Sequence, residues 1–399
     1  MKLLIHTQWF DPEPNTFKGL SFAKALKQFD VENFVLTGFP NYPEGKIYPD
    51  YSGLIPRKEV MDGIPVYRTS LFPSHNRSAF LRSLNYLSFF VSSILRGLFC
   101  PKPDLIYSYH PPITTALSSW ILSLYWRVPL VLDIQDMWPE TLSTTGMVKN
   151  KTLLTFLKFL CYFLYKRANK IVVLSEGFKK HLIKNGISPS KISVIYNWTN
   201  ESASKDEEFE FSNKELLKFT FAGNIGPGQD LMSFIQAFSS INNEKEKAEL
   251  HIYGEGTQKK EIEEFLQRNK IKHIYLNNRV SDSKIKSIYK QSDVLLVHLK
   301  DDVLFEMTIP SKTQAYLVAG KPILMAVKGE AADIVKRSRS GITCNPQDTN
   351  SLKIAIDDFI KMSKEEREEK GYAGKSFYNR EMSMSRGVEK FVHLFKELT

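Results

Sequence analysis

The chain has 399 residues, which is too long for one hydrophobic core, and its content of 42% apolar and 25% charged residues is ordinary for a soluble globular protein. A formal net charge of +10 favours partners with negative charge, such as nucleic acid, anionic lipid or phosphate-bearing substrates. The three cysteines lie far apart without the spacing of metal ligands, which argues against structural zinc and a disulfide framework.

Short apolar runs typical of strands alternate with longer helical stretches along the whole chain, and the first ten residues fit a strand rather than a signal peptide. The predicted strands of the first half are 2–6, 33–37, 104–109, 129–134, 170–174 and 191–196. Those of the second half are 218–222, 248–253, 271–276, 293–299, 322–327 and 341–344. Helical stretches separate them, at 17–29, 176–185, 229–240, 257–269, 282–291 and 311–319. This alternation predicts an α/β protein with two Rossmann-like, doubly wound parallel sheets.

Composition also predicts the domain boundaries. Residues 200–215 are polar, acidic and without a strand, which is typical of a linker. The linker would separate an N-terminal domain of residues 1–199 from a C-terminal domain of residues 216–375. The charged run that follows predicts a C-terminal helix at 376–399, and this helix could pack back on the N-terminal domain.

A glycine-rich turn, "FAGNIGPGQD" at 221–230, joins a strand to a helix that we expect to begin near Gln229. Ligands of open parallel sheets bind beyond the carboxyl ends of strands, where glycines let a phosphate approach the backbone N–H groups. Gly223, Asn224 and Gly226 are therefore candidate phosphate-binding residues. A tight turn without a ligand would explain the glycines equally well.

The stretch "FEMTIPSKTQAYLVAGKPIL" at 305–324 places a carboxylate, Glu306, close to a predicted helix start. Ser311 suits the N-cap, and Lys312 would lie in the first helical turn. A lysine there opposes the helix dipole at a cost of about 0.3–1 kcal/mol, which a bound anion would offset. The alternative is a lysine that faces solvent, as most lysines do.

Polar residues also follow strands in the first half. Asp136, in "DIQDMWPE", could orient or deprotonate a hydroxyl group, or it could cap a helix. His110 lies beyond another strand, although a lone histidine is more often structural. Asn15 and Thr16 follow the first strand and suit a helix N-cap, which would share its helix end with an anion site.

Two apolar, aromatic stretches at 79–99 and 152–167 carry arginine or lysine residues but are not clean spanning helices. Both could lie at a membrane surface with their cations towards anionic headgroups, or both could be buried helices. Nucleic-acid binding is permitted by the charge, yet no signature of a helix-turn-helix, RNA-recognition or zinc-finger domain occurs. The pair Asp301-Asp302 indicates a solvated loop rather than a metal site, because no ligand-spaced cluster accompanies it.

Several motifs occur in an order that resembles glycosyltransferase family 4, with the GT-B fold. In the second half they are "GNIG", "SDVLLVHL" and "E…IPSK…Y…AGKPIL"; in the first half they include "LTGFPNYPEGK", "LDIQDMWPETL" and "VLSEGFKKHL". The chain is most similar to the branch that builds bacterial O-antigen and capsule units, and within it to N-acetyl-L-fucosamine transferases. The resemblance implies two domains that face across a cleft, with the nucleotide-sugar donor on the second and the acceptor on the first.

The resemblance also implies roles for individual residues. Glu306 matches the family glutamate near the donor sugar, and the loop of Asn15 and Thr16 approaches the donor phosphates. The place of a second glutamate, which contacts the ribose, falls on Ala315 with Gln314 beside it, so Glu330 could supply that contact instead.

An arginine and a lysine that family members often carry after the first strand of this domain are Asn224 and Gln229 here. Lys312 and Arg279 are then the candidates that meet the charge of the diphosphate. In the first half, Gln135 stands where a family histidine often lies near the reaction centre.

The implied activity is transfer of a sugar from a nucleoside diphosphate such as UDP to a polyprenyl-diphosphate-linked saccharide in lipopolysaccharide O-antigen or capsule biosynthesis. The sugar would be an N-acetylated 6-deoxyhexose such as N-acetyl-L-fucosamine. The enzyme would act without cofactor, metal or nucleic acid, in the cytoplasm on the inner face of the bacterial inner membrane. A non-hydrolysing nucleotide-sugar 2-epimerase shares this architecture and is the main alternative; a basic nucleic-acid-binding protein is the other.

Overall fold

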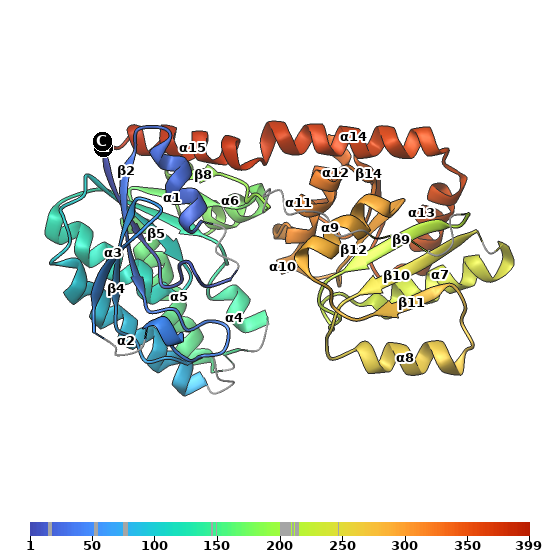
Figure 1. Ribbon diagram of the computed structural model, residues 1–399, viewed down its shortest axis with the longest axis horizontal. Coiled ribbons are helices and arrows are strands. Elements are labelled where there is room, and N and C mark those ends of the chain that lie inside the picture. Colours follow the sequence, from blue (N-terminus) through green and yellow to red (C-terminus); the bar gives the residue numbers. More distant parts are fainter. Residues whose placement is uncertain are drawn as a thin grey trace. The chain divides into compact units, whose positions relative to one another are not determined.

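The protein is described by a computed structural model that contains two compact units (Figure 1). The first unit consists of residues 1–197 and 385–399, and the second consists of residues 198–384. The structure describes residues 1–14, 18–51, 55–74, 79–144, 147–148, 150–199, 209, 211, 215–245 and 247–399. Most of the predicted linker, 200–215, lies outside the described residues, as do Asn15 and Thr16.

The first unit is built on an eight-stranded sheet in the order β3-β4-β2-β1-β5-β6-β7-β8. Its strands are β1 (Lys2–His6), β2 (Glu32–Gly38), β3 (Arg57–Met61), β4 (Ile64–Thr69), β5 (Leu105–His110), β6 (Leu130–Ile134), β7 (Lys170–Val173) and β8 (Ile192–Val194). All neighbouring strands pair in parallel except β3 and β4, which are antiparallel. The central strands are buried on both faces, which explains their continuous apolar sequences.

Helices connect these strands and cover the sheet. They are α1 (Leu20–Lys27), α2 (Ala79–Gly97), α3 (Ile113–Trp126), α4 (Glu140–Thr144), α5 (Lys151–Arg167) and α6 (Glu176–Lys184). Ser175 caps α6 by accepting the N–H of Phe178 at 3.0 Å, and Asn150 caps α5 in the same way through Leu153.

The antiparallel hairpin β3–β4 was not predicted. Asp62 and Gly63 join its strands with φ values of 47° and 79°, the combination of a type I′ turn. The Asp-Gly pair was therefore a visible hairpin signal. The strand before it, "RKEVM", is half exposed and charged, so it lacks the apolar pattern of the buried strands.

The second unit contains a six-stranded sheet, wholly parallel, in the order β11-β10-β9-β12-β13-β14. Its strands are β9 (Leu217–Ala222), β10 (Ala248–Tyr253), β11 (Ile274–Asn277), β12 (Val294–His298), β13 (Ile323–Ala326) and β14 (Gly341–Thr343). Its helices are α7 (Leu231–Lys245), α8 (Lys259–Arg268), α9 (Asp282–Gln291), α10 (Val303–Met307), α11 (Ser311–Ala319), α12 (Glu330–Ser338), α13 (Thr349–Lys361) and α14 (Lys364–Glu381). The predicted α/β class with two doubly wound parallel sheets is thus confirmed.

The end of the chain returns to the first unit. Helix α15 (Met384–Lys396) lies beside α1 (Figure 1), and the ring of Phe391 packs 5.2 Å from Phe22 and 5.7 Å from Tyr107. The predicted C-terminal helix is therefore two helices: α14 belongs to the second unit and α15 to the first.

Candidate functional site

Two glycine loops form the mouth of the second sheet. Gly223 follows β9 and Gly254 follows β10, with φ values of 145° and 159°. A Cβ atom on Gly254 would lie 1.9 Å from the carbonyl oxygen of Gly223, so a larger residue cannot replace Gly254 without displacing backbone. The Gly223 N–H donates to the carbonyl of Tyr253 at 2.9 Å, which fixes the two loops to each other.

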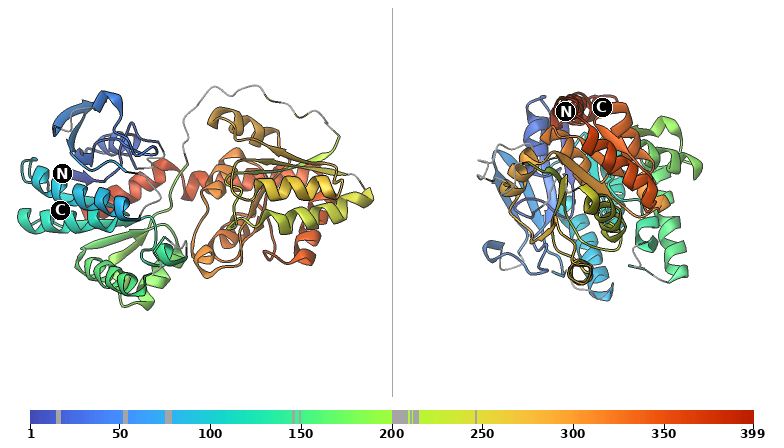
Figure 2. Two further views of the ribbon diagram at one scale, coloured as in Figure 1. Left: turned by 90° about the horizontal axis from the view of Figure 1, so that it is seen from below. Right: turned by 90° about the vertical axis from the view of Figure 1, so that its right-hand side faces the viewer.

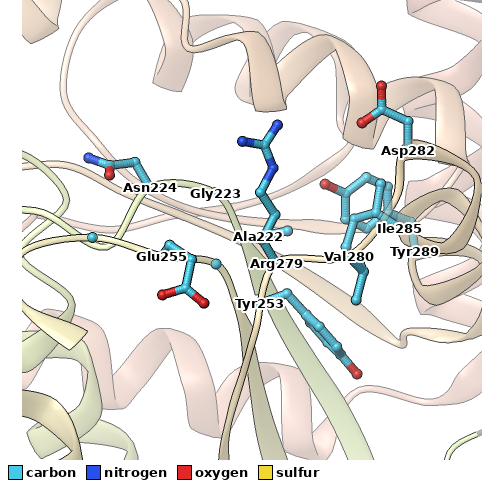
Figure 3. Close-up of a pocket in the computed structure, with 12 residues that line it drawn as sticks. Ala222, Gly223, Asn224, Tyr253, Glu255, Arg279, Val280, Asp282, Ile285 and Tyr289 are labelled. Atoms are coloured by element: carbon cyan, nitrogen blue, oxygen red, sulfur yellow. The ribbon is translucent and has the colours of Figure 1, made fainter. Parts of the chain in front are cut away.

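A pocket of about 520 Å³ opens at the carboxyl ends of β9, β10 and β11, and Figure 3 shows side chains of all three following loops around it. Its size is in the range of small-molecule sites. Three predicted site residues, Gly223, Asn224 and Arg279, line it together with Tyr253 and Glu255. The predicted Gly226 lies next to them, since a Cβ there would be 2.8 Å from the side-chain amide of Asn224.

Lys312 lies in the first turn of α11, as predicted, and reaches the mouth of β9. Its Nζ is buried 3.6 Å from the centre of the Phe221 ring and has no hydrogen-bond partner among the residues that the structure describes. A Cβ on Gly223 would lie 2.5 Å from its Cε, so the lysine stem covers the glycine directly. Burial lowers the pKa of Lys312 to about 7. A buried amine without an acceptor, at the carboxyl end of a parallel strand, can serve an anionic ligand.

The predicted N-cap at Ser311 is wrong. The N-cap residue of α11 is Pro310, which makes no side-chain cap, and its carbonyl accepts the N–H of Thr313 at 2.8 Å. Ser311 is the exposed first residue of the helix instead. The buried Gln314 follows one turn later, and its amide nitrogen, in the orientation that satisfies both ends, donates to the carbonyl of Pro310 at 2.9 Å.

The two candidate carboxylates lie on neighbouring helices, α10 and α12. Gly329, with φ 74°, precedes Glu330, and a Cβ on this glycine would meet the carbonyl oxygen of Glu306 at 2.1 Å. The backbones of the two glutamate segments therefore touch. Glu306 is half-buried, whereas Glu330 is buried at the N-terminus of α12 with Arg337 3.9 Å away.

Asp301 and Asp302 lie in a partly exposed loop, as predicted, and both also have structural partners. Asp302 caps α10 by accepting the N–H of Leu304 at 2.8 Å, and Asp301 pairs with Lys328 at 2.5 Å. Among the described residues, no group of three or more histidine, cysteine, aspartate or glutamate side chains is placed to hold a metal ion.

His298 lies at the same end of the second sheet, and the sequence analysis did not single it out. It ends β12, is fully buried, and its Nδ1 lies 2.7 Å from the carbonyl of Gln229, which requires the proton on Nδ1. Burial lowers the pKa of His298, and the charge of nearby Lys312 lowers it further. Its position at the carboxyl end of a buried parallel strand was the signal that could have identified it.

In the first unit, a buried ion pair holds the segment that follows β6. Lys18 Nζ lies 2.5 Å from Asp133 Oδ2, and the hydroxyl of Tyr107 donates to the same oxygen. Gln135 donates to the other oxygen of Asp133 at 2.7 Å and accepts from Asn197 at 2.8 Å. Asp133 therefore has its hydrogen-bond partners inside the protein.

Asp136 is different, because it is exposed at the carboxyl edge of the sheet. Crowding by neighbouring protein atoms nevertheless raises the pKa of Asp136 above its usual value. A carboxylate that is accessible and a stronger base than normal can accept a proton from a bound hydroxyl group.

His110 ends β5 and is fully buried. Its Nε2 lies 3.0 Å from the hydroxyl of Tyr165, and its ring packs against Trp138 and Tyr165. Burial lowers the pKa of His110 to about 4, so it is neutral at pH 7. This environment is typical of a histidine that positions its neighbours.

The loop after β1 is held by another buried carboxylate, Glu13. It accepts the N–H groups of Phe10, Asn41 and Tyr42 at 3.1, 2.8 and 2.8 Å. Burial raises the pKa of Glu13 to about 7, although these N–H groups oppose the shift. The same edge carries a row of edge-to-face aromatic rings, formed by Tyr42, Trp9, Tyr86 and Trp138.

Two family models match the chain. Residues 20–198 match the model described as glycosyl transferase 4-like domain, and residues 203–377 match the model described as glycosyl transferases group 1. Among individual proteins, the probable glycosyltransferase WbjE of Pseudomonas aeruginosa is 25% identical over 309 residues, which are 73% of this chain and 75% of that protein. The uncharacterized glycosyltransferase MJ1069 of Methanocaldococcus jannaschii is 22% identical over 257 residues, 63% of this chain and 64% of that protein.

Solved structures match over the whole chain. The crystal structure of Anabaena Alr3699/HepE in complex with UDP superposes with a TM-score of 0.69 at 14% identity, covering 100% of both chains. Sucrose-phosphate synthase from Thermosynechococcus elongatus gives a TM-score of 0.68 at 13% identity, covering 100% of this chain and 99% of the other. At these identities the likeness concerns the fold, which is GT-B.

Proposed function

Since the chain is a glycosyltransferase with the GT-B fold, we propose that it transfers a sugar from a uridine diphosphate sugar to a lipid-linked saccharide. The observation that carries the donor part of the proposal is the buried amine of Lys312 against Gly223, at the mouth of a parallel sheet. The complexes of Anabaena HepE with UDP and with UDP-glucose support uridine as the base.

The donor would use the pocket of the second unit. We place the nucleoside in the 520 Å³ pocket and the diphosphate between Lys312, Arg279 and the backbone of Gly223 and Asn224. Glu306 would face the donor sugar, and Glu330 would accept from the ribose hydroxyls. Gln314, whose amide is engaged with the start of α11, would hold that helix end in place.

The chemistry requires the diphosphate to leave with its charge neutralised. Charge develops on the leaving oxygens as the bond between sugar and phosphate breaks, and preorganised cations and N–H groups stabilise that state most. Lys312 is already desolvated and positioned, so little reorganisation accompanies the reaction. The role that we assign to Lys312 is to place a positive charge beside the leaving diphosphate.

The acceptor would bind to the carboxyl edge of the first sheet. Asp136 would orient or deprotonate the attacking hydroxyl, because its exposure and raised pKa suit a base. His110 would position the segments of Trp138 and Tyr165 around it. The half-buried rings of Trp9 and Tyr86 offer apolar surface next to this edge.

The finer assignments rest on the motifs of the sequence. We propose an N-acetylated 6-deoxyhexose, such as N-acetyl-L-fucosamine, as the donor sugar, and a polyprenyl-diphosphate-linked saccharide of O-antigen or capsule synthesis as the acceptor. We propose that the reaction takes place at the cytoplasmic surface of the inner membrane. Among the described residues, no helix has both the length and the hydropathy needed to cross a bilayer.

A calorimetric titration with UDP tests the donor site. Lys312→Met keeps the length of the stem and removes the charge, so we expect the Kd for UDP to rise by about tenfold or more, as loss of a charged hydrogen bond to phosphate would do. The matched control is Lys361→Met, because this lysine is 69% exposed and lies at the C-terminal end of α13, on the opposite edge of the sheet from the pocket.

Equal UDP affinity in Lys312→Met and the control would remove the lysine from the donor site. The reaction class needs a separate assay, in which the protein is incubated with UDP-sugars alone. Release of an epimerised UDP-sugar without any acceptor would assign the protein to the 2-epimerases instead.

A further inference from the structure

Helix α2 exposes an apolar stripe along its whole length. The stripe consists of Phe80, Leu84, Leu87, Val91, Leu95 and Leu98, and it continues to Phe99, which is 82% exposed. Their spacing of three or four residues places them on one side of the helix. A helix on the surface of a globular protein normally turns such a stripe towards the core.

The inner side of α2 is partly polar, and hydrogen bonds fix it there. Asn85 is buried; it accepts from Gln8 at 2.6 Å and donates to the carbonyl of Phe72 at 2.6 Å. Ser93 is also fully buried, and it lies on the same side of the helix as the buried Phe89. The helix therefore cannot rotate to bury its apolar stripe without breaking buried hydrogen bonds.

The exposed apolar surface continues over two neighbouring helices. Gly97 of α2 packs against Leu122 of α3 so closely that a Cβ would lie 2.6 Å from a leucine methyl carbon, and α2 and α3 run side by side (Figure 2). Trp120 of α3 meets Phe163 of α5 edge to face at 5.2 Å. The further exposed residues are Leu124 and Tyr125 of α3 and Leu153, Phe156 and Phe159 of α5. We call the outer side of these three helices the α2–α3–α5 face.

The charge of this face has one sign. Residues 79–99, 113–127 and 151–167 contain no aspartate or glutamate. They contain seven cations: Arg82, Arg96, Arg127, Lys151, Lys158, Lys166 and Arg167. The exposed Lys158 and Arg167 lie over aromatic rings of α5, with Arg167 5.3 Å from the centre of Phe163, so their stems follow the apolar surface. Arg96 differs, because it lies over the buried ring of Tyr67.

We propose that the α2–α3–α5 face docks on the surface of an anionic phospholipid bilayer. Exposed leucine and phenylalanine side chains would enter the boundary between headgroups and acyl chains, while the arginines and lysines would pair with lipid phosphates. This inference rests on the proposed lipid-linked acceptor and names the surface of the protein that would contact the bilayer.

Charge complementarity selects lipid over a second copy of the chain. Two copies joined through this face would oppose seven cations to seven others, with no acidic residue of the three helices to separate them. A bilayer with anionic lipids offers negatively charged headgroups to the cations and an apolar interior to the leucine and phenylalanine side chains. Helices α2 and α5 also begin after the carboxyl ends of their strands, so the docked face adjoins the edge that carries Asp136.

Co-sedimentation of the full chain with vesicles tests the proposal. We expect binding to vesicles of phosphatidylcholine with phosphatidylglycerol, weak binding to phosphatidylcholine alone, and release at about 0.5 M NaCl, where charge interactions are screened. The double variant Leu87→Glu/Leu95→Glu changes two exposed positions of the stripe, 54% and 57% exposed, and should weaken vesicle binding by about tenfold or more.

The matched control is Ile354→Glu/Tyr372→Glu, which introduces the same charge at exposed apolar positions of the second unit, 64% and 76% exposed, and should bind vesicles as the unchanged protein does. Equal vesicle binding by both double variants, or no preference for anionic vesicles, would overturn the proposal. So would a concentration-dependent dimer that only Leu87→Glu/Leu95→Glu abolishes. UDP binding is measured in parallel, because it should remain unchanged in both variants and thus separates this proposal from the donor site.

Discussion

At the residue scale, the proposed donor site depends on a single amine. Lys312 Nζ is buried over an aromatic ring without a hydrogen-bond partner among the described residues, and a lysine in the first turn of a helix also opposes the helix dipole. Both effects favour the neutral amine, which agrees with a pKa lowered to about 7. A bound diphosphate would favour the charged amine instead, because its negative oxygens would raise the pKa of Lys312.

UDP affinity should therefore depend on pH. Below pH 7 Lys312 is already protonated in the free protein, whereas above pH 7 binding must draw a proton from solvent, since the diphosphate raises the pKa again. We expect the Kd for UDP to rise by about tenfold per pH unit above 7 until the pKa of the bound state is reached. Calorimetry between pH 6 and pH 9 in buffers of different ionisation heat would measure both the Kd and the proton uptake. In Lys312→Met, we expect neither the rise of the Kd nor the proton uptake above pH 7. A Kd for UDP that does not change with pH in the unchanged protein would contradict the assigned role.

The sequence predicted where Gly223 and Lys312 lie, because a strand end and a glycine or a helix start coincided there; their binding roles stay predictions. It failed where the outcome depended on packing. Ser311 has the right side chain for a cap, but Pro310 already provides the carbonyl that starts α11. His298 resembled part of an apolar strand, and only the structure shows that it contacts the loop of Gln229.

At the scale of elements, α15 packs against residues that lie far away in the chain. Phe391 is fully buried between Phe22 and Tyr107, and Lys18 lies 4.9 Å from the centre of its ring. Lys18 in turn forms the buried ion pair with Asp133 beside the acceptor edge. The C-terminal helix thus completes the core of the first unit and covers a buried charge.

Phe391→Ala should lower the free energy of unfolding of the first unit by about 3–5 kcal/mol, because it removes a buried ring and leaves a cavity. Urea unfolding followed by tryptophan fluorescence reports on this unit, which contains Trp9, Trp120, Trp126 and Trp138. Tyr372→Ala on α14 is the control, since this side chain is 76% exposed and the change should stay within about 0.5 kcal/mol. Equal midpoints for the two variants would mean that α15 contributes little to the first unit.

Most of the parallel strands were predictable because they are buried on both faces and have continuous apolar sequences. The half-exposed β3 lacked that pattern, although the Asp62-Gly63 sequence is typical of a hairpin turn. The stretch 79–99 was correctly seen as apolar, but its sequence did not tell which side faces inward. The buried hydrogen bonds of Asn85 decide that, and they come from residues far away in the chain.

At the scale of the whole molecule, the two units divide the chemistry. The second holds the cations proposed for the diphosphate, and the first holds the exposed carboxylate proposed for the acceptor. Since Lys312 and Arg279 would neutralise the leaving group, we expect sugar transfer to proceed without a divalent ion.

An assay of sugar transfer in EDTA tests this expectation. The rate should stay within about twofold of the rate with added Mg²⁺, because protein cations supply the electrostatic stabilisation. A loss of about tenfold or more that Mg²⁺ or Mn²⁺ restores would instead indicate metal-assisted departure of the diphosphate.

The route of the chain, out of the first unit at residue 197 and back at residue 385, has a consequence for biosynthesis. A ribosome must translate the whole second unit before it delivers α15, which completes the first unit. Until then, Phe22 and Tyr107 lack the rings of α15 that cover them. The core of the first unit therefore stays incomplete until α15 has been translated. A truncation that removes α15 would destabilise the first unit, although the change lies after the second.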